Sequence, residues 1–151
     1  MLDPKTLKNN ILQDLRVELT DEFDRNFERK AFFGDRWKPR RNEGKGTLLL
    51  VSSTLRRSIR RSSVVGDGVR FTSQVPYATI HNEGGPYTQN VRAHQRHRGS
   101  KAYNVRAHQR RINMPQRQFV GDGPDTRRII KSVIDDNLQQ YNNELTKALR
   151  Q

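Results

Sequence analysis

The sequence contains no cysteine, and this absence removes three classes of site at once. A chain without thiols forms no disulfide bond, has no thiolate nucleophile and builds no cysteine-based zinc site. The chain also lacks any apolar run close to the roughly 20 residues of a membrane-spanning helix. Its N-terminus has no apolar signal-peptide core. We therefore expect the protein to be cytoplasmic in the cell that makes it.

Apolar residues are also scarce. They make up 32% of the 151 residues, whereas ordinary globular domains contain about 45–50%. A chain of this length is most simply a single domain, and we expect one domain to span residues 1–151. With so few apolar side chains, its core must be thin or must be completed by another subunit.

Acidic residues are missing from one long segment. Residues 34–123 hold 18 Lys and Arg against five Asp and Glu, so the whole net charge of +13 lies there. Between Glu83 and Asp122 there is no acid at all, whereas eight Lys or Arg and three of the four histidines fall in that stretch. Charge that is organised in this way implies an anionic partner or a channel of positive potential. Nucleic acid is the obvious candidate, and a solvated loop is the simpler alternative.

One basic heptapeptide, NVRAHQR, occurs twice within this segment, at residues 90–96 and 104–110. Basic and uncharged residues alternate in both copies, and Gly99-Ser100-Lys101 between them is a turn signal, so residues 86–113 are predicted to form a projecting hairpin. We expect an even register with the loop centred on Ser100, which places Arg92 opposite His108 and gives one wholly basic face. The predicted DNA- or partner-binding residues are Arg92, His94, Arg96, Arg98, Lys101, Arg106, His108, Arg110 and Arg111.

Two tyrosines flank this repeat. Tyr87 and Tyr103 either stack on bases or pack against the protein, and packing is the simpler role. An Arg-rich ribbon can grip phosphate without reading sequence, which suits a groove or a channel.

The two ends of the chain are predicted to be helical. From Pro4 to about Ala31, apolar residues recur at helical spacing with no Gly or Pro inside. These residues are spaced four apart, whereas a helical turn has about 3.6 residues, so the apolar stripe winds slowly around the helix axis. The helix should therefore contact two different surfaces. Gly123-Pro124-Asp125 begins a second amphipathic helix, since Pro suits a first turn.

Between these helices the residue pattern changes from helical spacing to an alternation with a period of two residues. Alternating residues on either side of Gly66-Asp67-Gly68 predict a hairpin that Pro76 ends, and Ser53 and Thr54 are plausible caps of a short helical turn. The fold class is therefore α+β: a long N-terminal helix and a C-terminal helix packed on a small antiparallel sheet, with a projecting basic β-hairpin.

Enzyme motifs are absent. The sequence has no HExxH, no P-loop, no GxSxG and no paired carboxylates at a recognisable spacing. His94 and His108 could ligate a metal across the hairpin, but their Arg neighbours would repel a cation. We expect no catalytic residue, no metal site and no cofactor.

Several segments occur in an order that resembles the phage virion morphogenesis family, the tail completion proteins of Mu-like contractile-tailed phages and prophages. They are a Trp-containing connector at 33–37, a Gly-x-Leu to Ser-Ile segment at 46–59, a Val-Pro-Tyr-Ala-x-Ile-His-x-x-Gly-Gly segment at 75–85, and a Pro-x-Arg-x-Phe-x-Gly segment at 115–121. The chain has Ser53-Thr54 where the family commonly has Thr-Gly. The motif residues, interpreted as structural, are Trp37, Leu55, Arg56, Tyr77, Ala78, His81, Gly84, Gly85, Pro115, Arg117, Phe119 and Gly121.

The resemblance implies a small α+β subunit of a ring at the head-to-tail junction, where a finished tail joins a DNA-filled capsid. Its expected partners are further copies of itself, adjacent neck, tail-terminator or tail-tube proteins, and genomic double-stranded DNA passing through the ring. The expected location is the virion, after assembly in the host cytoplasm. The alternative is a free-standing nucleic-acid-binding protein that uses the Arg-rich hairpin on the phosphate backbone.

Overall fold

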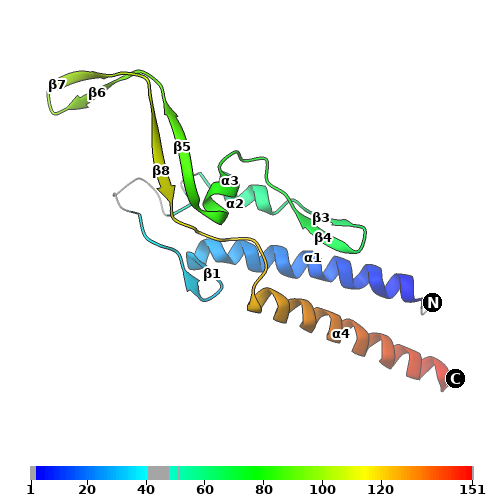
Figure 1. The fold of residues 1–151 in the computed structure, drawn as a ribbon. Helices are drawn as coiled ribbons and strands as arrows, with labels where there is room; N and C mark the ends of the chain where they lie inside the picture. The colour runs from blue at the N-terminus through cyan, green and yellow to red at the C-terminus, as the bar shows by residue number, and fades with distance from the viewer. Residues whose placement is uncertain (1–2, 41–47, 51, 151) are drawn as a thin grey trace.

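Two long helices, joined through short strands and helices, form the body of the protein. The computed structural model describes residues 3–40, 48–50 and 52–150. Helices α1 (Pro4–Arg29) and α4 (Pro124–Leu149) lie side by side and run in opposite directions, so both chain termini lie at one end (Figure 1). None of the helices in these residues is long and apolar enough to cross a membrane.

Local signals set the ends of the two helices. The Asp3 side chain accepts a hydrogen bond from the Thr6 amide and caps α1, which Lys30 ends in the left-handed conformation. Pro124 occupies the first turn of α4, as the sequence predicts. Ser53 does precede the short helix α2 (Thr54–Ile59), but it has a positive φ and makes no side-chain capping bond, so its predicted capping role is wrong.

The described strands form four separate two-stranded antiparallel pairs. The α+β class is confirmed. Where the sequence predicts one small sheet, however, these strands form four separate pairs at different places in the fold. The pairs are β1 with β2 (Ala31–Phe32, Asp35–Arg36), β3 with β4 (Ser62–Val65, Gly68–Phe71), β5 with β8 (Gly85–Val91, His108–Met114) and β6 with β7 (His94–Arg98, Lys101–Val105). The short helix α3 (Ala78–Glu83) precedes β5.

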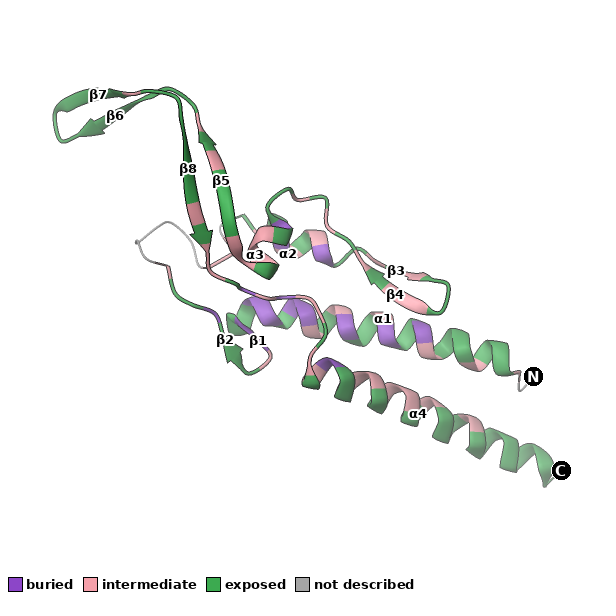
Figure 2. Cartoon of the chain, viewed as in Figure 1, coloured by how far each residue is buried: buried purple, intermediate pink, exposed green. Residues whose placement is uncertain are grey.

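The hydrophobic core is narrow and aromatic. Phe27 is fully buried, its ring meets the Trp37 ring edge-on with centroids 5.7 Å apart, and the Phe119 ring lies on it at 5.1 Å. Burial is concentrated on the C-terminal half of α1, whereas Thr126 is the only residue of α4 that is buried (Figure 2). The thin core expected from composition therefore leaves most of α4 only half-covered.

An ion pair fastens α2 to α1. The Arg56 guanidinium donates from Nε to Asp24 Oδ1 at 2.8 Å and from Nη2 to Asp24 Oδ2 at 2.5 Å. Asp24 is buried, and its hydrogen bond to Arg56 holds the pKa of the carboxyl below its ordinary value. The family-motif residue Arg56 is thus a fixed structural contact between two helices.

Asp24→Asn is expected to lower the free energy of unfolding by about 2 kcal/mol at neutral pH, because it leaves a partly buried guanidinium without its main partner. A carboxyl with a depressed folded pKa stabilises above its unfolded pKa, and that stability is lost as pH falls through the folded value. The difference in the free energy of unfolding between wild type and variant should therefore disappear below about pH 4. Urea unfolding at several pH values measures this, with the exposed Asp21→Asn as control; a gap that is constant with pH would contradict it.

Candidate functional site

A long two-stranded ribbon, residues 85–114, leaves the body at its base and extends away from it (Figure 1). The β5–β8 pair forms the stem and the β6–β7 pair forms the tip. All nine residues predicted to bind DNA or a partner lie on this ribbon: Arg92, His94, Arg96, Arg98, Lys101, Arg106, His108, Arg110 and Arg111.

The register of the ribbon differs from the prediction. His94 lies opposite Val105 in the tip, and Val91 lies opposite His108 in the stem, so the numbers of opposed residues sum to an odd value. The even register, with Arg92 opposite His108 and a loop centred on Ser100, is wrong. The reason is the turn: Gly99, with a φ of +62°, and Ser100 form a two-residue connection between Arg98 and Lys101. In this register Arg98 lies directly opposite Lys101, so the geometry of the turn prevails over a pair of like charges.

This register places cations on both faces of the stem and on one face of the tip. Directly opposed residues share a face, so Arg96 lies on the same face as Tyr103 in the tip. In the stem, Arg110 lies on the same face as Gln89, and its Nε donates to the Gln89 side chain at 2.8 Å. Its neighbour Arg111 lies on the other face, because successive residues of a strand alternate. The tip therefore has one basic face, which carries Arg96, Arg98 and Lys101, whereas the stem has no single basic face.

The duplicated heptapeptide builds a bend between stem and tip. In the first copy the ladder stops at Arg92-Ala93, and in the second it stops at Arg106-Ala107. His94 Nδ1 donates to the Arg92 carbonyl at 2.8 Å, and His108 Nδ1 donates to the Arg106 carbonyl at 2.8 Å. The two copies thus make the same local turn on the two arms, and the ribbon changes direction there (Figure 1).

The ribbon's charged side chains face solvent. Every residue of β6 is exposed, and none of the ion pairs within the described residues involves a residue of the ribbon. Tyr87 and Tyr103 are 43% and 47% exposed, so each presents part of its ring to solvent. The ribbon therefore offers guanidinium, imidazole and aromatic groups to a partner without internal competition from carboxylates.

Two motif segments converge at the base of the ribbon. The Arg117 amide donates to the His81 carbonyl at 2.8 Å, and a Cβ added to Gly84 would lie 2.6 Å from the Gln116 nitrogen. The Asn82 side chain accepts from the amides of Phe119 at 2.9 Å and Val120 at 3.1 Å. These contacts hold the two strands of the stem side by side, which agrees with the structural role that the sequence assigns to the two motif segments.

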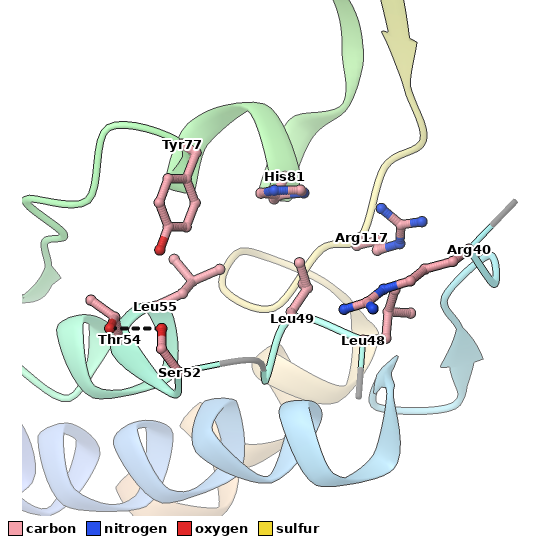
Figure 3. Close-up of a pocket in the computed structure, with 9 residues that line it drawn as sticks. All are labelled: Arg40, Leu48, Leu49, Ser52, Thr54, Leu55, Tyr77, His81 and Arg117. Atoms are coloured by element: carbon pink, nitrogen blue, oxygen red, sulfur yellow. Dashed lines mark hydrogen bonds between the residues drawn. The ribbon is translucent and has the colours of Figure 1, made fainter. Parts of the chain in front are cut away.

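A cavity of about 310 Å³ lies beside this junction (Figure 3). Tyr77 and His81 project from α3 on one side, and Ser52, Thr54 and Leu55 lie on the other. The lining residues of these segments are Arg40, Leu48, Leu49, Ser52, Thr54, Leu55, Tyr77, His81 and Arg117. The family-motif residues Leu55, Tyr77, His81 and Arg117 thus share one cavity.

The electrostatics of this cavity are set by burial. Burial, and then the positive charge of Arg117, lower the pKa of His81, so its imidazole is neutral. Burial, and then the charge of Arg40, lower the pKa of Arg117. His81 is one of the motif residues interpreted as structural, and its Nδ1 is buried without a partner among the described residues. The described residues contain no group of three or more His, Asp or Glu able to hold a metal ion.

The other motif residues lie in the body. Trp37 is buried and its Nε1 donates to the Gln118 carbonyl at 2.6 Å, while Ala78 and Phe119 belong to the core. Gly85 and Pro115 flank the foot of the stem, and Gly121 precedes α4. Gly46, Thr47 and Val51, which also carry the resemblance, lie outside the described residues.

Comparison with known proteins agrees with this arrangement. The model of the phage virion morphogenesis family matches residues 2–139, a span that includes the ribbon, its base and most of both long helices. The chain belongs to the phage virion morphogenesis family. The resemblance carried by the motif segments is thereby confirmed, and a role in phage morphogenesis follows. No curated protein and no solved structure shows a significant match.

Proposed function

We propose that this member of the phage virion morphogenesis family is a structural tail completion or neck subunit, which forms a ring at the head–tail junction and joins the tail to the DNA-filled capsid. The observation that carries the proposal is the ribbon, an arm that holds seven Lys and Arg and no Asp or Glu, and so +7 of the net charge of +13, and that extends away from the body (Figure 1). An arm of this kind serves contact with a neighbouring component rather than the stability of its own subunit. The role is non-catalytic and requires no cofactor.

Assembly into a ring is supported by the incomplete cover of the long helices. Leu138 and Leu145 of α4 are 41% and 38% exposed, and Leu149 is 80% exposed. Next to them, α1, α4 and the β3–β4 hairpin line an apolar groove that includes Leu7, Ile11 and Val69. Apolar helix faces of this extent are stabilised by contact with further protein. Copies of the same chain arranged around a closed ring would supply that contact.

The ribbon is the proposed contact with DNA in the channel or with an acidic surface of an adjacent ring. Arg96, Arg98 and Lys101 at the tip are exposed and carry no acidic partner among the described residues. Opposite charges that meet across an interface speed association and fix its orientation.

Reversing two tip charges, Arg96→Glu with Arg98→Glu, is expected to reduce the number of joined head–tail particles by at least about tenfold, because the variant repels the anionic partner. Particles are counted by electron microscopy and by infectious titre. The matched control is Arg61→Glu with Arg70→Glu, two exposed positions on the body that undergo the same change in net charge. If both variants reduce the number of joined particles equally, the ribbon has no specific role in joining.

The same variants test the alternative of a free-standing nucleic-acid-binding protein. The Arg-rich ribbon favours this alternative, because exposed guanidinium groups bind phosphate without a protein partner. If the isolated wild-type protein binds duplex DNA tightly at physiological salt, and the tip variant loses that affinity steeply while particles still join, the alternative replaces the structural role. If the isolated protein binds DNA weakly and the tip variant fails to join heads to tails, the result supports the structural role at the junction.

A further inference from the structure

The cavity beside the ribbon base holds a buried cation that lacks a carboxylate. Arg117 is only 6% exposed, and its guanidinium donates to two neutral acceptors, the carbonyls of Lys38 at 3.1 Å and Pro39 at 3.5 Å. No described Asp or Glu forms an ion pair with it or lines the cavity. Buried charges in proteins are ordinarily matched by an opposite charge. Arg40 lines the same cavity, and its positive charge, after burial, lowers the pKa of Arg117.

Other polar groups around the cavity are suited to a small anion. The hydroxyl of Tyr77 points across the cavity toward α2, where the hydroxyls of Ser52 and Thr54 lie 2.9 Å apart (Figure 3). The Nδ1 atom of His81 is buried without a partner among the described residues. A neutral imidazole with an unsatisfied nitrogen, beside hydroxyls and a guanidinium, can donate to an anion that enters.

The walls of the cavity distinguish between anions. Leu48, Leu49 and Leu55 supply apolar surface next to the cationic end. A hydrated phosphate of a nucleic-acid backbone gains little from leucine side chains. The methylene groups of an acidic amino-acid side chain can cover them while its carboxylate reaches the guanidinium, which pairs with planar carboxylates through two parallel hydrogen bonds.

We infer that this cavity binds a carboxylate, that of an aspartate or glutamate side chain presented by a protein partner. The source of that side chain rests on the proposed function, since a neighbouring subunit or an adjacent virion protein would bring it to the ribbon base. The carboxylate would approach Arg117 and the imidazole of His81, with its aliphatic part against the leucines. Occupation of the cavity would then hold α3 and the segment after β8 together, and so fix the ribbon to its partner.

Acetate binding to the isolated full chain tests the site without any partner. Imidazole resonances of the four histidines are followed by NMR during titration with sodium acetate and, separately, with inorganic phosphate. Saturable shifts are expected at His81, whose pKa rises because the bound anion favours the charged imidazolium. His94, His97 and His108 on the ribbon should respond weakly and without saturation. Acetate should saturate the His81 response at lower concentration than phosphate does.

Two substitutions at the cavity and one on the ribbon complete the test. Arg117→Lys is expected to weaken acetate binding by about tenfold, because an ammonium cannot reproduce the two-pronged contact. Since Arg117 is also packed in the body, Arg40→Gln, at a half-buried position, provides a second variant that should weaken binding severalfold while leaving the fold intact. Arg96→Gln removes the same charge from the ribbon tip and should leave the His81 response unchanged.

The outcomes separate this inference from the proposed junction role. No saturable shift at His81, or equal shifts in wild type and Arg40→Gln, would overturn the carboxylate site while leaving the ribbon experiment intact. Tighter binding of phosphate than of acetate would also overturn it, and would assign the cavity to a nucleic-acid backbone. A His81 response that disappears in Arg96→Gln would place the anion on the ribbon instead.

Discussion

Asn26→Ala is expected to lower the free energy of unfolding by about 3–5 kcal/mol, one of the two largest effects predicted for this protein. Asn26 is completely buried in the last turn of α1. Its Nδ2 donates to the Phe119 carbonyl at 3.1 Å, and its Oδ1 accepts from the Phe33 amide at 2.9 Å. Alanine leaves these backbone groups buried without partners and opens a void beside Phe27. Such a loss is a large part of the roughly 5–15 kcal/mol that stabilises a small domain.

Urea unfolding followed by fluorescence measures this loss, because Trp37 is the only tryptophan and packs on Phe27. The matched control is Asn9→Ala, an exposed position of the same helix, which should change stability by less than about 0.5 kcal/mol. If both variants unfold at the same urea concentration, Asn26 does not tie α1 to the segment that follows the ribbon.

Gly84→Ala is expected to destabilise the protein by about 3 kcal/mol and to loosen the ribbon at its base. Gly84 has a φ of +72°, a conformation that costs an alanine energy, and the added Cβ would lie 2.6 Å from the Gln116 backbone nitrogen. Because the obstacle is backbone rather than a flexible side chain, α3 and the segment around Gln116, which follows β8, must move apart. That movement should break the hydrogen bond from the Arg117 amide to the His81 carbonyl.

Gly85→Ala separates the two causes. Gly85 also has a positive φ, of +102°, but nothing lies within 4 Å of its added Cβ. This variant should therefore lose only about 1–2 kcal/mol from backbone strain. Amide hydrogen exchange at Arg117 is expected to accelerate in the Gly84 variant and to stay slow in the Gly85 variant. Equal acceleration in both would mean that contact with Gln116 is unimportant.

The sequence predicts the type of each long element well and its pairing poorly. Periodicity identifies α1 and α4, because an apolar stripe along 26 residues leaves little ambiguity. The sequence predicts the wrong register for the ribbon. Alternation within each heptapeptide is compatible with either register, and the segregation of basic residues onto one face favours the even register. The deciding signal was the length of the turn, since Gly99 and Ser100 alone connect the strands.

The polar contacts at the base of the ribbon could not be predicted from the sequence. Nothing in the sequence marks Asn26 or Asn82, yet the Asn26 side chain donates to the Phe119 carbonyl and the Asn82 side chain accepts from backbone amides of the same segment, far along the chain. A side chain that satisfies a distant backbone group has no local pattern. The cavity that His81 and Arg117 share also has no local sequence pattern, although both residues belong to motif segments that the sequence identifies.

Arg110 and Arg111 lie on opposite sides of the ribbon's stem, and this limits the shape of whatever receives the stem. A flat acidic surface can touch one side only, and it would leave the guanidinium groups of the other side in water. Complete neutralisation requires an enclosure with negative walls on two sides, such as a gap between stacked components or a narrow passage packed with nucleic acid.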